Sequence, residues 1–305
     1  MIIEREDQVT EAVLSETQRI EDPRLKQIIQ SLIRHLHGFA REVRLTEQEF
    51  NSAINLVSAL GKLTTDSHNE TRLIAGSLGV STLVCMMNNA GTTANLLGPF
   101  WRKDAPQVDN GGSIVRSPTP GAPLFFTGRV LDTDGRPIAG AHVDVWHAST
   151  KGLYENQDPS QADWNLRGRF TTDETGGFSY RTIKPSGYPV PAGGPTEKLL
   201  SVQHRHPFRP AHLHALVYKE GFKTIASQVY ADDDENLTSD AQFGVTTNAI
   251  GHYVRHEGPA PDPDIQGSWY SMAYTFVLKP GESWLPTPPV SAKSNVAAAS
   301  MKGAG

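Results

Sequence analysis

Cysteine is almost absent, since Cys85 is the single example in 305 residues. The chain therefore cannot form an internal disulfide, and thiolate clusters for zinc or iron–sulfur centres are excluded. Any metal site must use nitrogen and oxygen donors. Residues 78–87 are apolar nearly all round and predict a buried helix, in which Cys85 is interpreted as a small core residue rather than a reactive thiol.

Long apolar runs and long runs of lysine or arginine are also missing. The formal net charge of −5 gives no general attraction for nucleic acid or anionic membranes, and no segment approaches membrane-spanning length. The opening residues MIIEREDQVT are acidic where a signal peptide would be basic and then apolar. We therefore expect a cytoplasmic protein that binds no nucleic acid and does not insert into a membrane.

Proline is scarce from about residue 8 to 87, where apolar residues recur at helical spacing. One stripe comprises Leu25, Ile28, Ile29, Leu32, Ile33 and Leu36. Thr46 and Glu49 form a capping-box pattern ahead of a second helix. These patterns predict an N-terminal helical domain whose apolar stripe packs either within its own domain or against another subunit.

After Gly98, glycine, proline and β-branched residues increase, and strand patterns are separated by turn residues such as Asp134-Gly135. The predicted strands are residues 125–131, 141–147, 178–183, 212–218, 225–230 and 271–278. Without intervening helices they predict an antiparallel β-sandwich. The expected fold is mixed, with a helical domain (1–108), a β-sandwich domain (109–286) and a flexible tail (287–305).

Two histidines, His212 and His214, are separated by one residue on a predicted strand. Side chains at this spacing project from the same face, so the two imidazoles could share one metal ion. A second pair, His204 and His206, lies in a charged segment that we expect to be a loop. The pattern leaves two readings of His212 and His214 open, as metal ligands or as hydrogen-bonded structural residues.

No acidic motif near these histidines completes a two-histidine, one-carboxylate triad or a zinc hydrolase site. Tyrosine is the remaining donor of interest. Tyr154 lies in KGLYEN just past a strand end, and Tyr188 lies in PSGYP. A glycine near each one would allow close approach to a site. From the residues alone, these could equally be loop tyrosines with hydroxyls in water.

Three segments, VWHASTKGLY, LRGRFTTDETGGFSYRTIKPSGYPVP and RPAHLH, together closely resemble the intradiol ring-cleavage dioxygenases of the catechol and hydroxyquinol 1,2-dioxygenase type. The resemblance extends from the N-terminal helices to about Leu278. It implies a β-sandwich catalytic domain and one Fe(III) per subunit. It also implies that Tyr154 and His212 are equatorial ligands and that Tyr188 and His214 are axial ligands.

The same resemblance implies a reaction in which an aromatic diol and O2 meet at the metal. Tyr188 is then expected to leave the metal and act as a base. Arg209 is expected to stabilise negative charge on the ring, and Gln228 to support charge and breakage of the O–O bond. The alternatives are a surface ion pair for Arg209 and a solvent-facing strand position for Gln228.

The segments LGPF, LRGRF, YPVP and RHPF look like the hydroxyquinol branch, which makes benzene-1,2,4-triol the first expected substrate, with maleylacetate/3-hydroxymuconate as product. Gly76, where hydroxyquinol enzymes often have Asp, and Gln228 depart from that branch. The alternative is a catechol or substituted-catechol dioxygenase that gives cis,cis-muconates. By position, the candidate substrate-binding residues are Leu73, Gly76, Leu97, Pro99 and Val245.

The resemblance further implies a homodimer joined through the N-terminal helices, at an interface where this family can hold a phospholipid. Two other functions compete with the dioxygenase interpretation. The segment GRVLDTDGRPIAGAHV is also typical of generic β-sandwich modules that bind without catalysis. A zinc hydrolase could use the two histidines, although tyrosine is not among the usual ligands of zinc.

Overall fold

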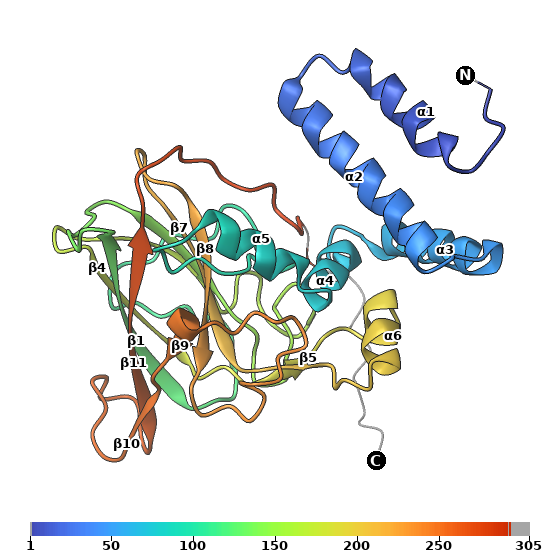
Figure 1. Ribbon diagram of the computed structural model, residues 1–305. Helices are drawn as coiled ribbons and strands as arrows, with labels where there is room; N and C mark the ends of the chain where they lie inside the picture. Colours follow the sequence, from blue (N-terminus) through green and yellow to red (C-terminus); the bar gives the residue numbers. More distant parts are fainter. Residues whose placement is uncertain (1, 292, 294–305) are drawn as a thin grey trace. The chain divides into compact units, whose positions relative to one another are not determined.

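The computed structural model describes residues 2–291 and 293, and it divides into two compact units between Ser58 and Ala59. The first unit is helical and the second contains all the strands (Figure 1). Residues 59–108 therefore share a compact unit with the sheets. A boundary between two domains after residue 108 remains a prediction.

The helical unit contains α1 (Gln8–Glu16), a short 3-10 turn η1 (Thr17–Arg19), α2 (Pro23–Glu42) and the beginning of α3 (Glu47–Leu63). Asp22 caps α2 by accepting from two backbone N–H groups, and Pro23 occupies the first turn, where its missing N–H costs nothing. Thr46 and Glu49 form the predicted capping box, because each side chain bonds to the backbone N–H of the other residue.

Two sheets form the predicted sandwich in the second unit. One has the order β3 (Arg167–Thr171), β2 (His142–Trp146), β7 (His212–Tyr218), β8 (Ile225–Ala231), β9 (Ile250–Gly251). The other has the order β10 (Val254–His256), β11 (Trp269–Leu278), β1 (Pro123–Asp132), β4 (Gly177–Ile183). A small ribbon pairs β5 (Tyr188–Pro189) with β6 (Phe208–Arg209).

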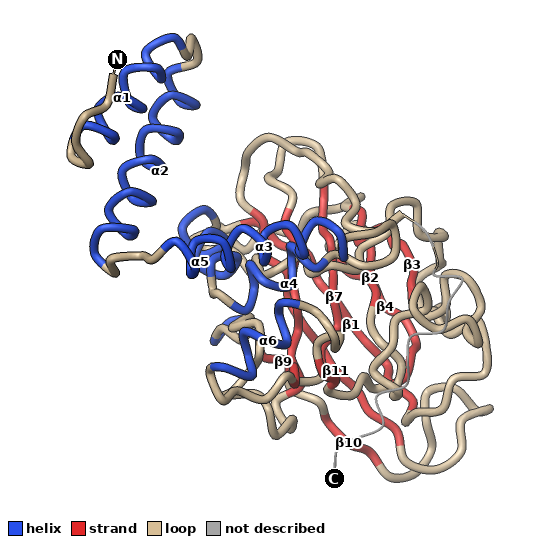
Figure 2. Tube along the Cα trace, turned by 90° about the vertical axis from the view of Figure 1, so that its right-hand side faces the viewer, coloured by secondary structure: helices blue, strands red, loops and turns tan. Residues whose placement is uncertain are grey.

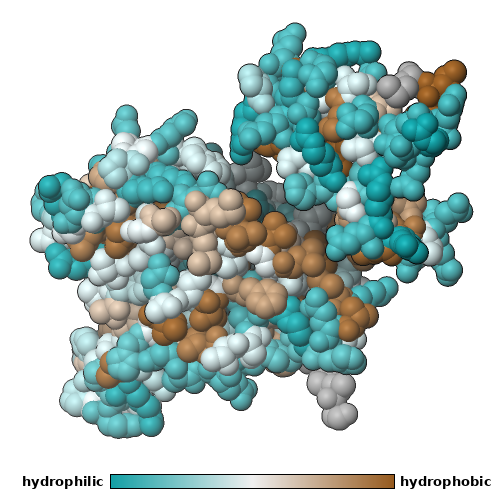
Figure 3. All heavy atoms as spheres, in the orientation of Figure 1, coloured by the Kyte–Doolittle hydropathy of each residue, from teal (hydrophilic) through white to brown (hydrophobic). Residues whose placement is uncertain are grey.

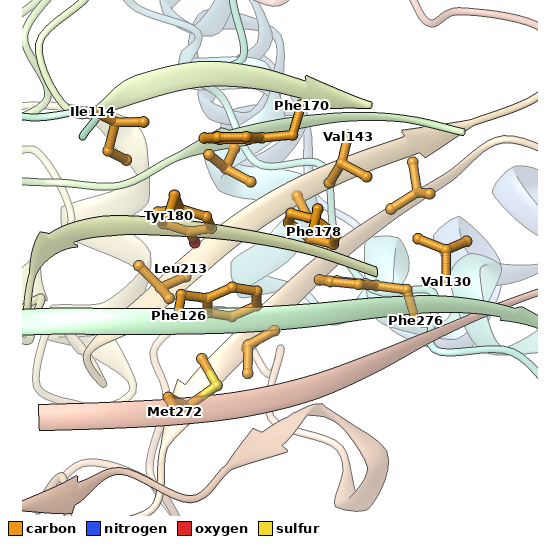
Figure 4. Close-up of a cluster of buried hydrophobic side chains, with 14 of the residues drawn as sticks. Ile114, Phe126, Val130, Val143, Phe170, Phe178, Tyr180, Leu213, Met272 and Phe276 are labelled. Atoms are coloured by element: carbon orange, nitrogen blue, oxygen red, sulfur yellow. The ribbon is translucent and has the colours of Figure 1, made fainter. Parts of the chain in front are cut away.

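The core lies between the two sheets and is rich in aromatic rings (Figure 4). Phe126 on β1 contacts Phe178 and Tyr180 on β4, with the Tyr180 ring stacked at 4.7 Å. From the facing sheet, Val143 and Leu213 project into the same cluster. Because alternate residues of each strand enter this core, the other face of β7 and β8 is available for a site.

Several details differ from the sequence-based expectation although the fold class is confirmed. The turn at Asp134-Gly135 does not join neighbouring strands, because β1 and β2 lie in opposite sheets. Strand β1 pairs in parallel with β11, so the sandwich is not purely antiparallel. A helix, α6 (Pro195–Val202), also interrupts the predicted run of strands.

Three helices of the second unit, α4 (Glu70–Ser77), α5 (Val80–Asn88) and α6, lie beside the sheets (Figure 2). The expectation of a buried helix at residues 78–87 was wrong for the single chain. On α5, Leu83 and Met87 are 60% and 73% exposed, and Figure 3 shows hydrophobic side chains gathered on this face. Cys85 is partly buried and free.

The predicted tail begins at residue 287, and most of it lies outside the described residues. In its described part, Val290 is buried and the N–H of Ser291 donates to the carbonyl oxygen of Asp66. Residues 287–291 are thus held against the protein. Among the residues that the structure describes, none of the helices combines the length and the hydrophobicity that crossing a membrane requires.

Candidate active site

The two histidines predicted from the sequence lie on β7, the central strand between β2 and β8. His212 and His214 are both 1% exposed and project from the same face of the strand, so that their Nε2 atoms are 3.1 Å apart. His204 and His206 of the second pair are exposed and take no part in this arrangement.

Both predicted tyrosines reach the same point, Tyr154 from a loop and Tyr188 from a short strand. Tyr154 follows β2, and Tyr188 lies in β5, where it pairs with Arg209 of β6. The two phenol oxygens are 2.7 Å apart. Tyr154 Oη is 2.9 Å from His214 Nε2, and Tyr188 Oη is 3.3 Å from His212 Nε2. Four buried donor atoms therefore converge on one point.

The histidine tautomers favour a cation at this point. His212 Nδ1 is 2.7 Å from the carbonyl oxygen of Pro210, which can only accept, so Nδ1 carries the proton and Nε2 keeps its lone pair. Burial lowers the pKa of His212 to about 3 and that of His214 well below its usual value. The lone pair of His212 Nε2 thus faces His214 Nε2 at 3.1 Å, and a metal ion bound by two neutral imidazoles would satisfy both nitrogens.

The tyrosines fit the same interpretation. Burial, together with the neighbouring phenol of Tyr188, raises the pKa of Tyr154 well above its usual value, and burial raises the pKa of Tyr188. A cation would offset this by stabilising phenolate. Donors bound to one ion at about 2 Å lie about 3 Å apart, as these four do. Within residues 2–291 and 293, no three His, Cys, Asp or Glu side chains gather into an alternative metal site.

Packing fixes the orientation of the donors. The ring of Tyr154 stacks on Phe100 with a centroid separation of 4.4 Å. His214 stacks on Trp146 at 4.7 Å and 9°, which holds the imidazole although its Nδ1 has no partner among the described residues. Next to Tyr154, Glu155 is fully buried and paired with Arg167.

Arg209 lies beside His212 in a buried polar network. Its Nη1 is 3.3 Å from His212 Nε2, and its Nε and Nη2 donate to the two oxygens of Asp240 at 3.0 and 3.1 Å. Nη2 also donates to Gln228 Oε1 at 2.8 Å and to Tyr230 Oη at 2.6 Å. Burial opposes the charge of Arg209, but Asp240 more than offsets it and holds its pKa well above the usual value.

Both sequence alternatives for this pair are therefore inconsistent with the structure. Arg209 is 3% exposed and is not part of a surface ion pair, and Gln228 is 0% exposed and does not face solvent. No sequence pattern points to Asp240 or Tyr230. Asp240 is 31 residues from Arg209, and no local pattern links the two.

A cavity of about 930 Å³ opens above these groups. Tyr188, Arg209 and Gln228 line it, whereas Tyr154, His212 and His214 do not. Of the four donors, Tyr188 is thus the one that an entering molecule meets first. The cavity is bounded by α4, α5 and the segment that leads to Phe100.

Four of the five predicted substrate-binding residues line this cavity. Leu73 and Gly76 contribute from α4, and Leu97 and Pro99 from the segment before Phe100. Val245 is partly buried and is not among the lining residues. Gln242, to which no sequence pattern points, lines the cavity next to Gly76.

Fold and site together define a β-sandwich protein whose buried tyrosine–histidine centre opens on a cavity and can hold one metal ion. Residues 96–280 match the family model described as Dioxygenase, and residues 22–95 match that described as Catechol dioxygenase N terminus.

Individual relatives agree with the family models. The chain is 38% identical to a hydroxyquinol 1,2-dioxygenase of Rhizobium sp. (strain MTP-10005), with 90% of this chain and 95% of the relative covered. It is 34% identical to a catechol 1,2-dioxygenase of Candida albicans, over 84% of this chain and 86% of that relative. The solved hydroxyquinol 1,2-dioxygenase of Pseudomonas putida DLL-E4 matches with a TM-score of 0.80 at 36% identity, over 90% and 99% of the two chains.

The chain therefore belongs to the intradiol ring-cleavage dioxygenases, as the sequence motifs predicted. It is an enzyme of the class that opens an aromatic ring between adjacent hydroxyls. The family is generally iron-dependent. The rival interpretations as a binding module or a zinc hydrolase are thereby set aside.

Proposed function

We propose that the chain holds one Fe(III) per subunit through Tyr154, Tyr188, His212 and His214. The supporting observation is the convergence of four buried donor atoms at separations of 2.7–3.3 Å. Phenolate oxygens are hard anionic donors and favour iron(III) over iron(II), whereas zinc sites use other ligands. When bound, the metal supplies Lewis-acid catalysis and a template for the diol.

The side chains have separate tasks in this proposal. Tyr188 lines the cavity and accepts a proton from one diol hydroxyl, while Tyr154, packed against Phe100, stays in place. Arg209 keeps a full positive charge next to His212 and stabilises negative charge as it develops on the ring. Gln228 lines the same wall and accepts from Arg209, which supports its predicted role in charge stabilisation.

We propose benzene-1,2,4-triol, hydroxyquinol, as the preferred substrate, with O2 as co-substrate and 3-hydroxymuconate or its tautomer maleylacetate as product. Several relatives with 35–38% identity bear the name hydroxyquinol 1,2-dioxygenase, which supports this choice. A catechol 1,2-dioxygenase at 34% identity makes catechol, cleaved to cis,cis-muconate, the second candidate.

Oxygen uptake by the iron-loaded enzyme tests the reaction and the substrate together. We expect one O2 consumed per ring, faster with benzene-1,2,4-triol than with catechol, and a product cleaved between the hydroxyls. Cleavage beside the hydroxyls, or no uptake with any diol or triol, would contradict the proposal.

Metal analysis and visible absorption test the ligand set. We expect one iron per chain and a red to burgundy colour from phenolate-to-iron(III) charge transfer. Tyr154→Phe should lose most of the iron and the colour, and removing iron with a chelator should abolish oxygen uptake. Tyr218→Phe is a matched control, because Tyr218 is on β7 but outside the cluster. A fully coloured Tyr154→Phe enzyme would remove Tyr154 from the ligand set.

We also propose that two chains form a homodimer through the N-terminal helices and that a phospholipid can occupy the interface. The exposed apolar side chains of α2 support the dimer, since Leu32 and Leu36 are 51% and 55% exposed in the single chain. A lipid extract of the purified enzyme, analysed by mass spectrometry, tests the second part.

A further inference from the structure

Gln242 lines the same cavity as Tyr188 and Arg209, and it is 5% exposed. Its backbone N–H donates to Asp240 Oδ1 at 3.1 Å, and the same oxygen accepts from Arg209 Nε at 3.0 Å. One carboxylate thus fixes the chain at Gln242 and the guanidinium next to His212. The position of Gln242 relative to the reacting groups is therefore well defined.

The orientation of the Gln242 amide follows from its partners. Nε2 is 3.2 Å from the carbonyl oxygen of Leu73 and 2.6 Å from Ser77 Oγ. Since a carbonyl oxygen can only accept, the atom that faces Leu73 must be the NH2 group. Oε1 accepts no hydrogen bond from the described residues. This acceptor lies at the wall of the cavity without a protein donor, so a ligand that displaces solvent there without offering a donor leaves it unpaired.

Gly76 provides the space for this oxygen. A Cβ atom built at position 76 would lie 2.0 Å from Gln242 Oε1 and 2.9 Å from its Cδ, so any other residue on this turn of α4 would displace the amide. Gly76 also lines the cavity. The glycine and the glutamine therefore form one unit at the cavity wall.

We propose that Gln242 Oε1, seated over Gly76, accepts a hydrogen bond from a ring hydroxyl that is not one of the two at the cleaved bond. Gln242 is thus a specificity-determining residue that selects trihydroxybenzenes over diols. This inference rests on the proposed function of the cavity. A substrate without the third hydroxyl leaves the oxygen unpaired, and sites built for a substrate hydroxyl discriminate strongly against analogues that lack it.

Benzene-1,2,4-triol and 4-methylcatechol form a matched substrate pair for the test, because a methyl group replaces the third hydroxyl at similar size. We expect Gln242→Met to lower the ratio of kcat/KM for the triol to kcat/KM for 4-methylcatechol by about 10-fold or more. Gly76→Ala should lower the same ratio, because it displaces the amide without changing its chemistry. It also provides a second variant if Gln242→Met does not fold.

Gln161→Met serves as the control, since Gln161 is similarly buried but lies outside the cavity. It should lower stability and leave the ratio unchanged. If wild type cleaves diols between the hydroxyls but Gln242→Met and Gly76→Ala keep the wild-type ratio, Gln242 has only a structural role and this inference is wrong. If wild type cleaves no diol or triol, the proposed function itself fails.

Discussion

Gly152 lies where the loops of the two tyrosines meet. Its φ is +74°, and a Cβ atom there would lie 2.5 Å from Tyr188 Cβ. Gly152→Ala should therefore destabilise the protein by about 1–2 kcal/mol through its left-handed backbone and also separate Tyr154 from Tyr188. We expect weaker iron binding, measured as metal content per chain and as the charge-transfer band.

Gly135→Ala separates the cost of the left-handed backbone from the displacement of the tyrosines. Gly135 has a φ of +80° but no atom within 4 Å of its Cβ position, so it carries the backbone cost alone. Denaturant unfolding should show a similar loss of stability for both variants, with iron binding reduced in Gly152→Ala only. Normal iron content in Gly152→Ala would mean that the tyrosine loops adjust freely.

Asp240 is the partner that holds Arg209 in position. Asp240→Asn removes the charge that offsets burial of the guanidinium, and one of the two hydrogen bonds is lost. We expect kcat to fall by about 10- to 100-fold while iron content and the absorption band remain. Steady-state oxygen uptake and metal analysis measure the two quantities.

Asp232→Asn is a suitable comparison for Asp240→Asn, because Asp232 pairs with the largely exposed His252. Its kcat should stay within about twofold of wild type, as expected for a surface ion pair. If Asp240→Asn loses its iron in parallel with its activity, the Asp240–Arg209 pair stabilises the metal site rather than the reaction.

The four proposed ligand residues could be named from the sequence only as a set, because the segments that contain them together resemble the intradiol dioxygenases. Taken separately, the histidine pair and the two tyrosines also allowed structural interpretations. Asp240 and Gln242 could not be predicted in the same way. Their partners, Arg209 and Gly76, are 31 and 166 residues away along the chain, and only the folded chain brings them together. Long-range contacts of this kind have no local sequence signature.

At the scale of elements, regular periodicity made α2 and the main strands predictable. Strands β5 and β6 have two residues each, which is too short for a period, although β5 carries Tyr188. The parallel pairing of β1 with β11 could not be predicted from local sequence either, since the paired residues are more than a hundred positions apart in the chain. The burial of α5 was predicted wrongly, because its apolar composition indicates that the helix is buried but does not show which surface buries it.

Glu70 joins two helices and gives a pH-dependent prediction. It is 1% exposed, and its oxygens accept from the Thr196 N–H at the start of α6 and from His68. Burial opposes the charge of Glu70, but these hydrogen bonds outweigh it, so its pKa lies below the usual 4.5. Its contribution to stability is therefore present above pH 4.5 and is lost as the pH falls through the folded-state pKa.

Glu70→Gln should lower the free energy of unfolding by about 1–3 kcal/mol at pH 7. The difference from wild type should narrow in urea titrations below pH 4.5. Glu21→Gln, at an exposed position, should show neither effect. A difference between wild type and Glu70→Gln that stays constant from pH 7 to pH 3 would contradict a role for the ionised carboxylate.

At the scale of the whole molecule, the chain combines a β-sandwich that has a buried hydrophobic core with a helical unit that exposes apolar side chains on one face. Within that unit, α1 covers part of α2, as the 3.0 Å distance between Thr10 Oγ1 on α1 and His37 Nδ1 on α2 illustrates. The stripe predicted from the sequence is therefore divided. Ile29 and Ile33 are partly covered, whereas Leu32 and Leu36 remain about half exposed.

The exposed residues of the stripe, Leu32 and Leu36, are the basis for predicting a homodimer through α2. Leu32→Glu combined with Leu36→Glu places two charges on this face, where burying them in a dimer interface would be costly. Light scattering at micromolar concentration should give the mass of two chains for wild type and of one chain for the variant. The cavity and the donor cluster lie entirely in the second compact unit, so the variant should still bind iron.

Arg34→Glu is the control, since residue 34 is two positions from Leu32 and so lies on nearly the opposite side of α2. It introduces negative charge on the same helix and should leave the mass of two chains unchanged. A wild-type protein with the mass of one chain would contradict the dimer. A double variant that still has the mass of two chains would place the interface elsewhere, and the exposed face of α2 would then have no assigned partner.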